Sequence, residues 1–316
     1  GSGTATVAAM GSILIPAMAA QGYDAGFSSA LSAISGSLGT VIPPSITFII
    51  YGMITGESIG DLFLSGIVPG LIFGFMLCIM VFIKSKKNGW KGDTQRASLK
   101  EIGRLFLDTI WGLLSPVIVL GGIYSGLFTP TEAAAVAVVY SLIVGIFIYK
   151  ELRLTELKET LFSTAKTTGM ILLIIMNAGI FSWVLTQQGI AASLTEMALA
   201  LTDNRYIMLF IINIVFLCAG CVMDNTSALY ILVPIIMPIA KALDINMIQL
   251  GVILVLNLSI GQVTPPVGPN LYVAADIGKV KFEVICRKMV PLLLMSLVAL
   301  FAITYIPALS LCLIPA

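Results

Sequence analysis

Long apolar runs separated by short polar segments make up most of the chain. An apolar run of about 20 residues is long enough to cross a bilayer as a helix. The hydropathy pattern therefore predicts membrane-spanning helices over 67–83, 109–124, 130–149, 170–187 and 290–311. A moderately apolar segment, 190–201, is predicted to lie flat at the membrane.

Shorter apolar arms lie beside polar tips at two places. The run 4–20 is short for a full crossing and suits the second arm of a re-entrant hairpin. The runs 206–223 and 227–243 are joined by Asp-Asn-Thr at 224–226 and are predicted to form a second hairpin.

Two further apolar runs, 26–53 and 248–274, each contain a pair of prolines. The first is interrupted by GTVIPPS at 39–45 and the second by GQVTPPV at 261–267. Proline removes a backbone donor and clashes with the preceding turn, so a helix must open at each place. Opened backbone at membrane depth is tolerated only where it is packed in protein or lines a wet cavity.

The two interruptions are 222 positions apart, and the same offset aligns other residues without gaps. The aligned pairs are Thr4 with Thr226, Pro16 with Pro238, Ser37 with Ser259, Gly56 with Gly278, and Pro69 with Pro291. A single proline break is more often a structural kink. Breaks at matching places in two halves of a chain instead point to the binding site of a secondary transporter.

The amino-acid composition indicates the class of protein. The chain is 58% hydrophobic and 10% charged, whereas soluble domains carry about a quarter charged residues, so we expect an all-α polytopic membrane protein. The absence of histidine excludes histidine catalysis, a histidine-ligated metal and a histidine proton relay. Cys218 and Cys221 have a suggestive spacing but lie in an apolar segment, where small packing residues are expected.

The distribution of Lys and Arg orients the predicted helices. If the basic stretch at 84–104 is cytoplasmic and each hairpin returns to the side it entered, 15 of the 17 Lys and Arg lie inside. Only Arg205 and Lys241 then lie outside, in agreement with the positive-inside rule. The first hairpin opens from the cytoplasm and the second from outside, so the repeat is predicted to have inverted topology.

Opened backbone carbonyls and nearby hydroxyls predict two Na⁺ sites, because a hard cation prefers oxygen ligands. The first site would use Ser2, Gly39, Val41, Ile42 and Pro43. The second would use Asn225, Thr226, Gly261, Val263 and Thr264. The chain offers no obvious proton relay, which favours Na⁺ as the coupling ion.

The hairpin tips and broken helices also supply groups for a substrate. The predicted substrate-binding residues are Ser2, Thr4, Ser45, Asp224, Asn225 and Asn270. Helix N-termini directed inward attract an anionic group, although the same tip residues also cap helices. Asp224 is the one acid predicted at membrane depth in either tip, and we assign it to polar substrate groups or to the cation's field.

Thr129-Pro130-Thr131-Glu132 has the pattern of a capping box with proline at the first helical position. Glu132 as an ion ligand is the alternative, but capping already explains this residue.

Four motifs in this order resemble the large membrane subunit of TRAP (tripartite ATP-independent periplasmic) transporters. They are GSGTAT at 1–6, GTVIPPS at 39–45, GLFTPTEA at 126–133 and GQVTPPVGPN at 261–270. The resemblance covers the whole chain. It implies an elevator mechanism and Na⁺-driven symport of organic acids across the bacterial inner membrane. It also implies two partners, a small membrane subunit (separate or fused) and a periplasmic substrate-binding protein.

The resemblance divides the chain into transport and scaffold parts. Residues 1–66 and 205–282 are expected to form the two transport repeats, 67–204 the scaffold and connecting helices, and 283–316 a C-terminal scaffold helix. Family members carry further helices before the position of Gly1, so we expect a preceding segment that includes the first hairpin's other arm.

Over its whole length the sequence most resembles the sialic-acid branch of these transporters, with a C4-dicarboxylate as the alternative substrate. Two other protein classes stay open. An ion channel would not need two hairpin tips at one site, and saturable Na⁺-coupled uptake would exclude it. An intramembrane redox enzyme would depend on Cys218 and Cys221, and full activity of a cysteine-free protein would exclude it.

Overall fold

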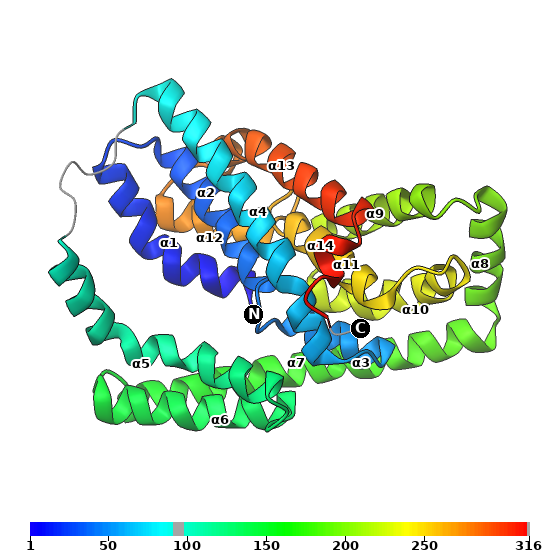
Figure 1. The fold of residues 1–316 in the computed structure, drawn as a ribbon, viewed down its shortest axis with the longest axis horizontal. Helices are drawn as coiled ribbons and strands as arrows, with labels where there is room; N and C mark the ends of the chain where they lie inside the picture. The colour runs from blue at the N-terminus through cyan, green and yellow to red at the C-terminus, as the bar shows by residue number, and fades with distance from the viewer. Residues whose placement is uncertain (91–97, 315–316) are drawn as a thin grey trace. The chain divides into compact units, whose positions relative to one another are not determined.

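A computed structural model describes residues 1–90 and 98–314, and every regular element in these residues is a helix (Figure 1). Eight of the described helices are long and apolar enough to cross a membrane. The predictions of an all-α fold and of a polytopic membrane protein are therefore confirmed. The chain divides into two compact units, one of Gly1–Gly92 with Ala178–Ala316 and the other of Asp93–Asn177.

The first unit begins with the elements of the first repeat. They are α1 (Gly3–Ala20), α2 (Ala25–Ser37), a short 3₁₀ helix η1 (Leu38–Thr40), α3 (Ile46–Thr55) and α4 (Ile59–Asn88). Asp24 caps α2 by accepting a hydrogen bond from the Phe27 amide at 2.8 Å. The interruption predicted at 39–45 covers the end of η1 and the residues before α3, so the first broken helix is confirmed.

The C-terminal half of this unit contains α8 (Ile190–Leu201), α9 (Arg205–Val222), α10 (Asn225–Ala242), α11 (Met247–Gly261), α12 (Pro269–Gly278), α13 (Phe282–Tyr305) and α14 (Ala308–Leu311). Helices α9 to α12 lie in the range expected for the second repeat. The second predicted interruption lies between α11 and α12, so this broken helix is also confirmed. Since α1, α9 and α10 each have 18 residues and also meet the length for a crossing, the re-entrant character of the hairpins stays a prediction.

Helix α11 is the centre of the first unit, and its residues from Gln249 to Gly261 are all buried. Buried amides connect α11 to its neighbours: Asn257 donates to the Asn213 side chain of α9 at 2.6 Å, and Asn213 donates to Thr304 of α13 at 3.1 Å. Polar side chains that bond across helices hold membrane bundles together, because the apolar effect is weak there.

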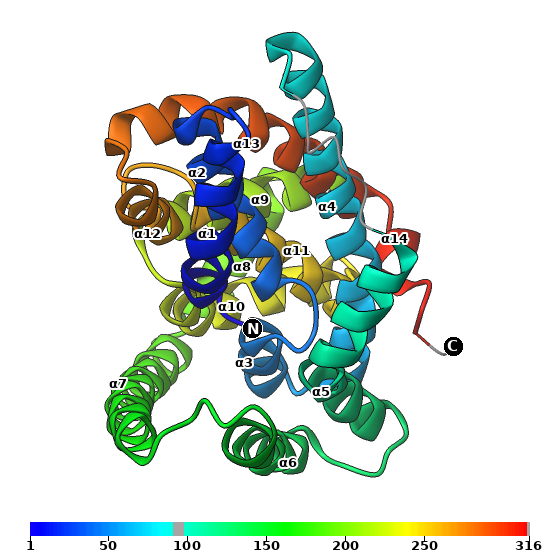
Figure 2. The same cartoon turned by 90° about the vertical axis from the view of Figure 1, so that its left-hand side faces the viewer.

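Helices α1 and α13 connect the N-terminal and C-terminal halves of the first unit. Helix α1 packs on α2 and α12, and α13 packs on α2 and α4 (Figure 2). Small residues at these contacts let the backbones approach. The β-carbon of any larger residue at Gly36 would meet the Val7 backbone amide at 3.1 Å. The division into transport repeats (1–66 and 205–282) and scaffold stays a prediction.

The second unit contains α5 (Leu99–Tyr124), α6 (Pro130–Ile143), a π-helical turn η2 (Val144–Ile148) and the first part of α7 (Leu154–Gln187). The predicted capping box is confirmed: the Glu132 amide donates to Thr129 Oγ1 at 3.3 Å, and the Thr129 amide donates to Glu132 Oε2 at 2.8 Å. Because Glu132 is committed to this cap, its alternative as an ion ligand gains no support.

Candidate functional site

The first break is an opening of the backbone between Thr40 and Ile46. Ser45 caps the restarted helix by accepting from the Phe48 amide at 3.3 Å, and its hydroxyl donates to the Thr40 carbonyl at 2.5 Å. Within residues 1–90 and 98–314, no backbone amide donates to the carbonyls of Val41 and Ile42. The break therefore leaves oxygen atoms without helical partners, as predicted.

The second break repeats this backbone pattern. The Val41 amide donates to the Leu38 carbonyl at 3.0 Å, and the Val263 amide, 222 positions later, donates to the Ile260 carbonyl at 3.1 Å. Both proline pairs, at 43–44 and 265–266, are joined by cis peptide bonds. The Gly261 carbonyl is not free, because it accepts from the Thr264 amide at 3.0 Å.

The N-terminus of α1 lies against the first break. Thr6 Oγ1 donates to the Ser2 carbonyl at 2.8 Å. A β-carbon added to Gly39 would lie 3.6 Å from that same carbonyl oxygen and in close contact with the Thr6 hydroxyl. Ser2 and Gly39, predicted as parts of the first Na⁺ site, are thus brought together.

The other predicted members of the first Na⁺ site face different directions. The carbonyl oxygen of Val41 lies 2.8 Å from the position of a β-carbon on Gly66, so it is directed towards α4. The side chain of Ile42 is 41% exposed, whereas Pro43 is buried. Of the residues predicted for this site, Ser2 and Gly39 are the two that lie close together.

The end of α9 lies against the second break. A β-carbon on Gly261 would come within 2.5 Å of the Gly220 backbone, and the Val267 amide donates to the Cys221 carbonyl at 3.3 Å. The tip between α9 and α10 therefore contacts the opened backbone of the second repeat. Gly220 carried no signal of this contact in the sequence, because it lies 41 positions before Gly261.

Residues predicted at the second tip begin α10. Asn225 is 7% exposed, and neither its Nδ2 nor its Oδ1 has a hydrogen-bond partner in the described residues. Thr226 is half-buried beside it. Thr264 Oγ1, within the break, donates to the Ile260 carbonyl at 2.8 Å. Buried polar groups are nearly always hydrogen-bonded, so an unpartnered amide such as Asn225 is a candidate for a ligand contact.

The two breaks are joined to each other. The hydroxyls of Thr40 and Ser259 lie 2.5 Å apart, and Asn270 donates to the Ala33 carbonyl at 3.4 Å. A β-carbon on Gly3 would contact Asn270 and Gln262, so the start of α1 also lies at the second break. The two repeats therefore meet through their interrupted segments.

Unpaired oxygens gather at this junction. Asn270 is fully buried, and its Oδ1 has no partner in the described residues; the same is true of Gln262 Oε1. Asn270 was predicted from the sequence as a substrate residue. Gln262 was not, although its place inside the second motif was a usable signal.

The remaining predicted substrate residues are engaged locally. Asp224 is exposed and caps α10, accepting from the Ser227 amide at 3.1 Å and from the Ser227 hydroxyl at 2.6 Å. The Ser45 hydroxyl donates its hydrogen bond to the Thr40 carbonyl and so has no hydrogen left for a substrate oxygen. Thr4 Oγ1 lies 3.3 Å from Ser2 Oγ.

The ligand types at the junction suit a hard cation. Backbone carbonyls, hydroxyls and amide oxygens are oxygen donors, which hard cations prefer. Within the described ranges, no group of three or more Cys, Asp or Glu residues is placed to hold a metal ion. A thiolate or carboxylate centre therefore finds no support there.

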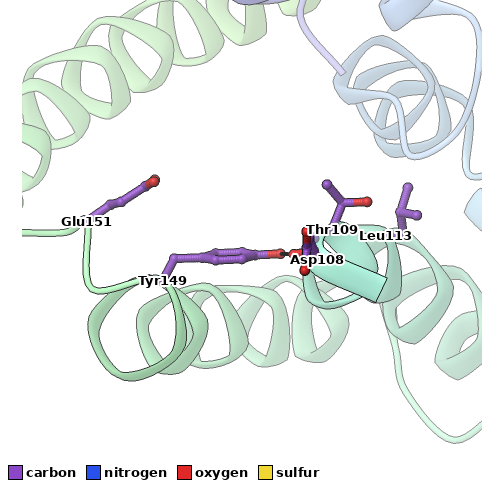
Figure 3. A pocket seen from close by; sticks show the side chains of 6 residues that line it. Asp108, Thr109, Leu113, Tyr149 and Glu151 are labelled. Carbon is purple, nitrogen blue, oxygen red and sulfur yellow. Dashed lines mark hydrogen bonds between the residues drawn. The ribbon is translucent and has the colours of Figure 1, made fainter. Parts of the chain in front are cut away.

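A separate cavity of about 370 Å³ lies within the second unit (Figure 3). The Tyr149 side chain points across it, and its hydroxyl donates to the Asp108 carbonyl at 3.1 Å. Glu151 and Thr109 also line this cavity, and none of its lining residues was predicted as a site residue.

Comparison with known proteins places nearly the whole chain in one family. Residues 1–309 match the family model for the DctM component of the tripartite ATP-independent periplasmic transporters. The chain is 42% identical over 308 residues to an isethionate TRAP transporter permease protein, DctMQ, of Oleidesulfovibrio alaskensis. That alignment covers 98% of this chain and 48% of the relative, so the chain spans about half of that protein.

Two further relatives carry other substrate names. The chain is 43% identical over 313 residues to the C4-dicarboxylate TRAP transporter large permease protein DctM of Pseudomonas aeruginosa, covering 99% of this chain and 73% of that protein. It is 36% identical over 311 residues to the sialic acid TRAP transporter large permease protein SiaM of Vibrio cholerae, covering 98% of this chain and 73% of that protein.

These findings agree with a multi-pass protein of the inner membrane and with a transporter component rather than an enzyme. Both expectations from the sequence are confirmed. The chain belongs to the DctM family of large membrane components of tripartite ATP-independent periplasmic transporters.

Proposed function

We propose that the whole protein carries out Na⁺-coupled symport of an organic anion, and that ion and substrate bind where the two interrupted segments meet. The observation that carries this proposal is the contact between the two repeats through the Thr40 and Ser259 hydroxyls, together with buried amide atoms of Asn225 and Asn270 that have no partner in the described residues. Opened backbone and orphan polar groups at one place in a membrane protein are costly unless they serve a ligand.

The proposed Na⁺ ligands come from both breaks. At the first, the Ser2 region and Gly39 are neighbours, and the carbonyls of Val41 and Ile42 lack backbone donors among the described residues. At the second, we propose Thr226, Val263 and Thr264, with Asn225 as an amide ligand. Na⁺ as the coupling ion rests on this oxygen-rich chemistry and on a chain without histidine.

The proposed substrate is an anion bound by helix ends and amides. Helices α1, α3 and α10 begin near the two breaks, and a helix N-terminus attracts negative charge. Asn225 Nδ2 has no partner in the described residues and can donate to a substrate oxygen, whereas the unpaired Oδ1 of Asn270 can accept from a substrate hydroxyl.

The substrate names of the relatives refine this class. The relatives named for isethionate and for C4-dicarboxylate are 42% and 43% identical to this chain, and the relative named for sialic acid is 36% identical. We therefore place a small dicarboxylate or sulfonate first and sialic acid, which the sequence alone favoured, second.

Membership of this family supports a proposed mechanism and two proposed partners. We propose that the two repeats slide as an elevator against a fixed scaffold. We also propose that the complex includes a small membrane subunit and a periplasmic substrate-binding protein. The name DctMQ of one relative fits a fused small subunit in that protein.

The test is uptake into proteoliposomes that contain the complete membrane complex, with its binding protein and with or without an inward Na⁺ gradient. Labelled succinate, isethionate and sialic acid would be compared. Uptake that needs both the binding protein and the gradient supports the proposal, whereas uptake indifferent to Na⁺ contradicts it. Non-saturating flux without the binding protein would favour the channel alternative.

A matched pair of variants tests the location of the site. Asn270→Leu removes a buried amide whose Oδ1 has no partner in the described residues, and Asn177→Leu removes an exposed amide on α7. We expect loss of uptake in the first variant and normal uptake in the second. Equal uptake by both would move the substrate site away from the junction.

A further inference from the structure

A polar cavity of about 410 Å³ lies at one end of the first unit, away from the two breaks. It is enclosed by the last turns of α4, the turn between α1 and α2, and the start of α13, which Figure 1 shows at the same end of this unit. Its lining includes the basic side chains of Lys84, Arg287 and Lys288 and a single acid, Asp24.

The basic groups of this cavity are only partly neutralised. Lys288 Nζ lies 3.2 Å from Asp24 Oδ1, and that same oxygen accepts from the Phe27 amide as the cap of α2. Within the described part of the chain, neither Lys84 nor Arg287 forms an ion pair. Two cationic side chains that face one cavity without a counter-charge favour an anionic ligand.

An aromatic side chain borders the same cavity. The Trp90 ring packs on Tyr23 and Phe27, with ring centroids 5.0 and 5.2 Å apart. Tryptophan is enriched where a membrane meets water, because its ring is apolar and its N–H is polar. The cavity therefore has the composition of a headgroup-level site.

An apolar crevice lies between α2 and α4, on the same two helices that line part of this cavity. Its volume is about 620 Å³, and its lining includes Leu31 and Leu38 of α2 and Gly74 and Leu77 of α4. The crevice ends at Ser85, the neighbour of Lys84 in α4, and Leu31 of the crevice lies one helical turn after Phe27 of the cavity on α2. From Ser85 to Gly74 a helix rises about 16 Å, which is close to half of the ~30 Å hydrocarbon core of a bilayer.

Ser85 marks the junction between the polar and apolar spaces. Its hydroxyl oxygen is buried and has no hydrogen-bond partner in the described residues. A hydroxyl at this depth, one residue from a free lysine, is placed to donate to an ester or phosphate oxygen.

We propose that the cavity and the crevice together bind one anionic phospholipid. Lys84 and Arg287 hold the phosphodiester, Trp90 borders the headgroup, and an acyl chain fills the crevice between α2 and α4. The crevice distinguishes a lipid from free phosphate, which has no apolar part to bury. This end of the unit carries Lys84, Lys86 and Lys87, which the charge distribution places in the cytoplasm, so the lipid belongs to the cytoplasmic leaflet.

The test is lipid retention by the complete membrane complex, purified with palmitoyl-oleoyl phosphatidylglycerol or phosphatidylcholine and measured by native mass spectrometry. We expect phosphatidylglycerol to be retained in preference to phosphatidylcholine. Lys84→Gln with Arg287→Gln should weaken phosphatidylglycerol binding about thirty-fold, because each basic group near a membrane surface contributes about 1 kcal/mol. Lys86→Gln with Lys87→Gln, the same charge change at exposed positions of α4, should leave retention nearly unchanged.

A second pair of variants tests the crevice. A β-carbon on Gly74 would have only an ordinary contact, 3.7 Å from Leu38 Cδ1, so Gly74→Leu should fill the crevice without disturbing α4. We expect it to lower retention of phosphatidylglycerol at least tenfold, the effect of about 1.4 kcal/mol. Leu71→Phe, which adds bulk at a position 62% exposed, should not lower it.

Three results would overturn the proposal. The first is equal retention of both lipids by the unmodified complex. The second is competition by inorganic phosphate or glycerol 3-phosphate as effective as that by phosphatidylglycerol, which would make the cavity a site for free phosphate. The third is unchanged retention in Gly74→Leu, which would mean that a protein segment or the small subunit fills the crevice.

Discussion

The contact between Gly220 and Gly261 gives a sharp prediction for Gly261→Ala. The added β-carbon would lie 2.5 Å from both the Cα and the carbonyl carbon of Gly220 and 2.8 Å from its oxygen. All three atoms belong to the backbone, so no side chain can rotate away. The end of α9 and the second break must separate by about 1 Å to restore ordinary contact distances of 3.5–4.0 Å between carbon atoms.

The magnitude follows from two opposing terms. Overpacking a close contact costs about 1–3 kcal/mol, and replacing glycine in a helix by alanine contributes about 0.5–1 kcal/mol in the other direction. We therefore expect a net destabilisation of about 1–2 kcal/mol for Gly261→Ala. Since the displaced segments are those proposed to hold Na⁺, the concentration of Na⁺ for half-maximal uptake should also rise.

Two other glycines provide a graded comparison. A β-carbon on Gly220 would meet the Gly261 Cα at 3.1 Å, a milder clash, whereas one on Gly179 would meet nothing within 4 Å. Thermal unfolding and Na⁺-dependent uptake of the purified complex would be measured for all three alanine variants. The expected order of stability is Gly179→Ala highest, Gly220→Ala intermediate and Gly261→Ala lowest. Identical behaviour of Gly261→Ala and Gly179→Ala would refute the close contact and its link to Na⁺ binding.

Three further predictions concern single side chains. Thr264→Val should raise the Na⁺ concentration needed for half-maximal uptake by removing a hydroxyl at the second break, and an unchanged Na⁺ dependence would exclude Thr264 as a ligand. Asp224→Ala should abolish uptake while membrane insertion persists, and Asp224→Asn separates charge from capping because asparagine caps as well as aspartate; normal uptake by both would reduce Asp224 to a dispensable cap of α10. Thr129→Ala should destabilise the protein by about 1 kcal/mol through loss of the capping box on α6, as measured by thermal unfolding, whereas Thr129→Ser should not, and equal midpoints would show that the cap is unimportant.

Local features of this protein could be predicted from the sequence because their causes are local. Prolines at 43–44 and 265–266 lack an amide hydrogen, so both breaks lie where the sequence placed them. The spacing of Thr129 and Glu132 fixed the start of α6 in the same way. Hydropathy and charge gave the membrane class, and the motifs gave the family, which the comparison confirmed.

The ends of the longer helices were predicted less accurately from the sequence. Helix α4 (Ile59–Asn88) extends beyond the predicted 67–83 at both ends, because charged and polar ends continue a helix that hydropathy alone would stop. Helix α5 (Leu99–Tyr124) likewise begins before the crossing predicted over 109–124.

The sequence by itself determined the repeat, the two openings of the backbone and the types of group available to a ligand. Only the tertiary structure decided which of those groups meet. The contact of Thr40 with Ser259, the approach of Gly220 to Gly261 and the position of Gln262 beside Gly3 join residues far apart in the chain. Such contacts depend on how whole helices pack, and no local pattern of residues encodes them. The same holds for the cavity at Lys84 and Arg287, where basic residues from two separate helices converge.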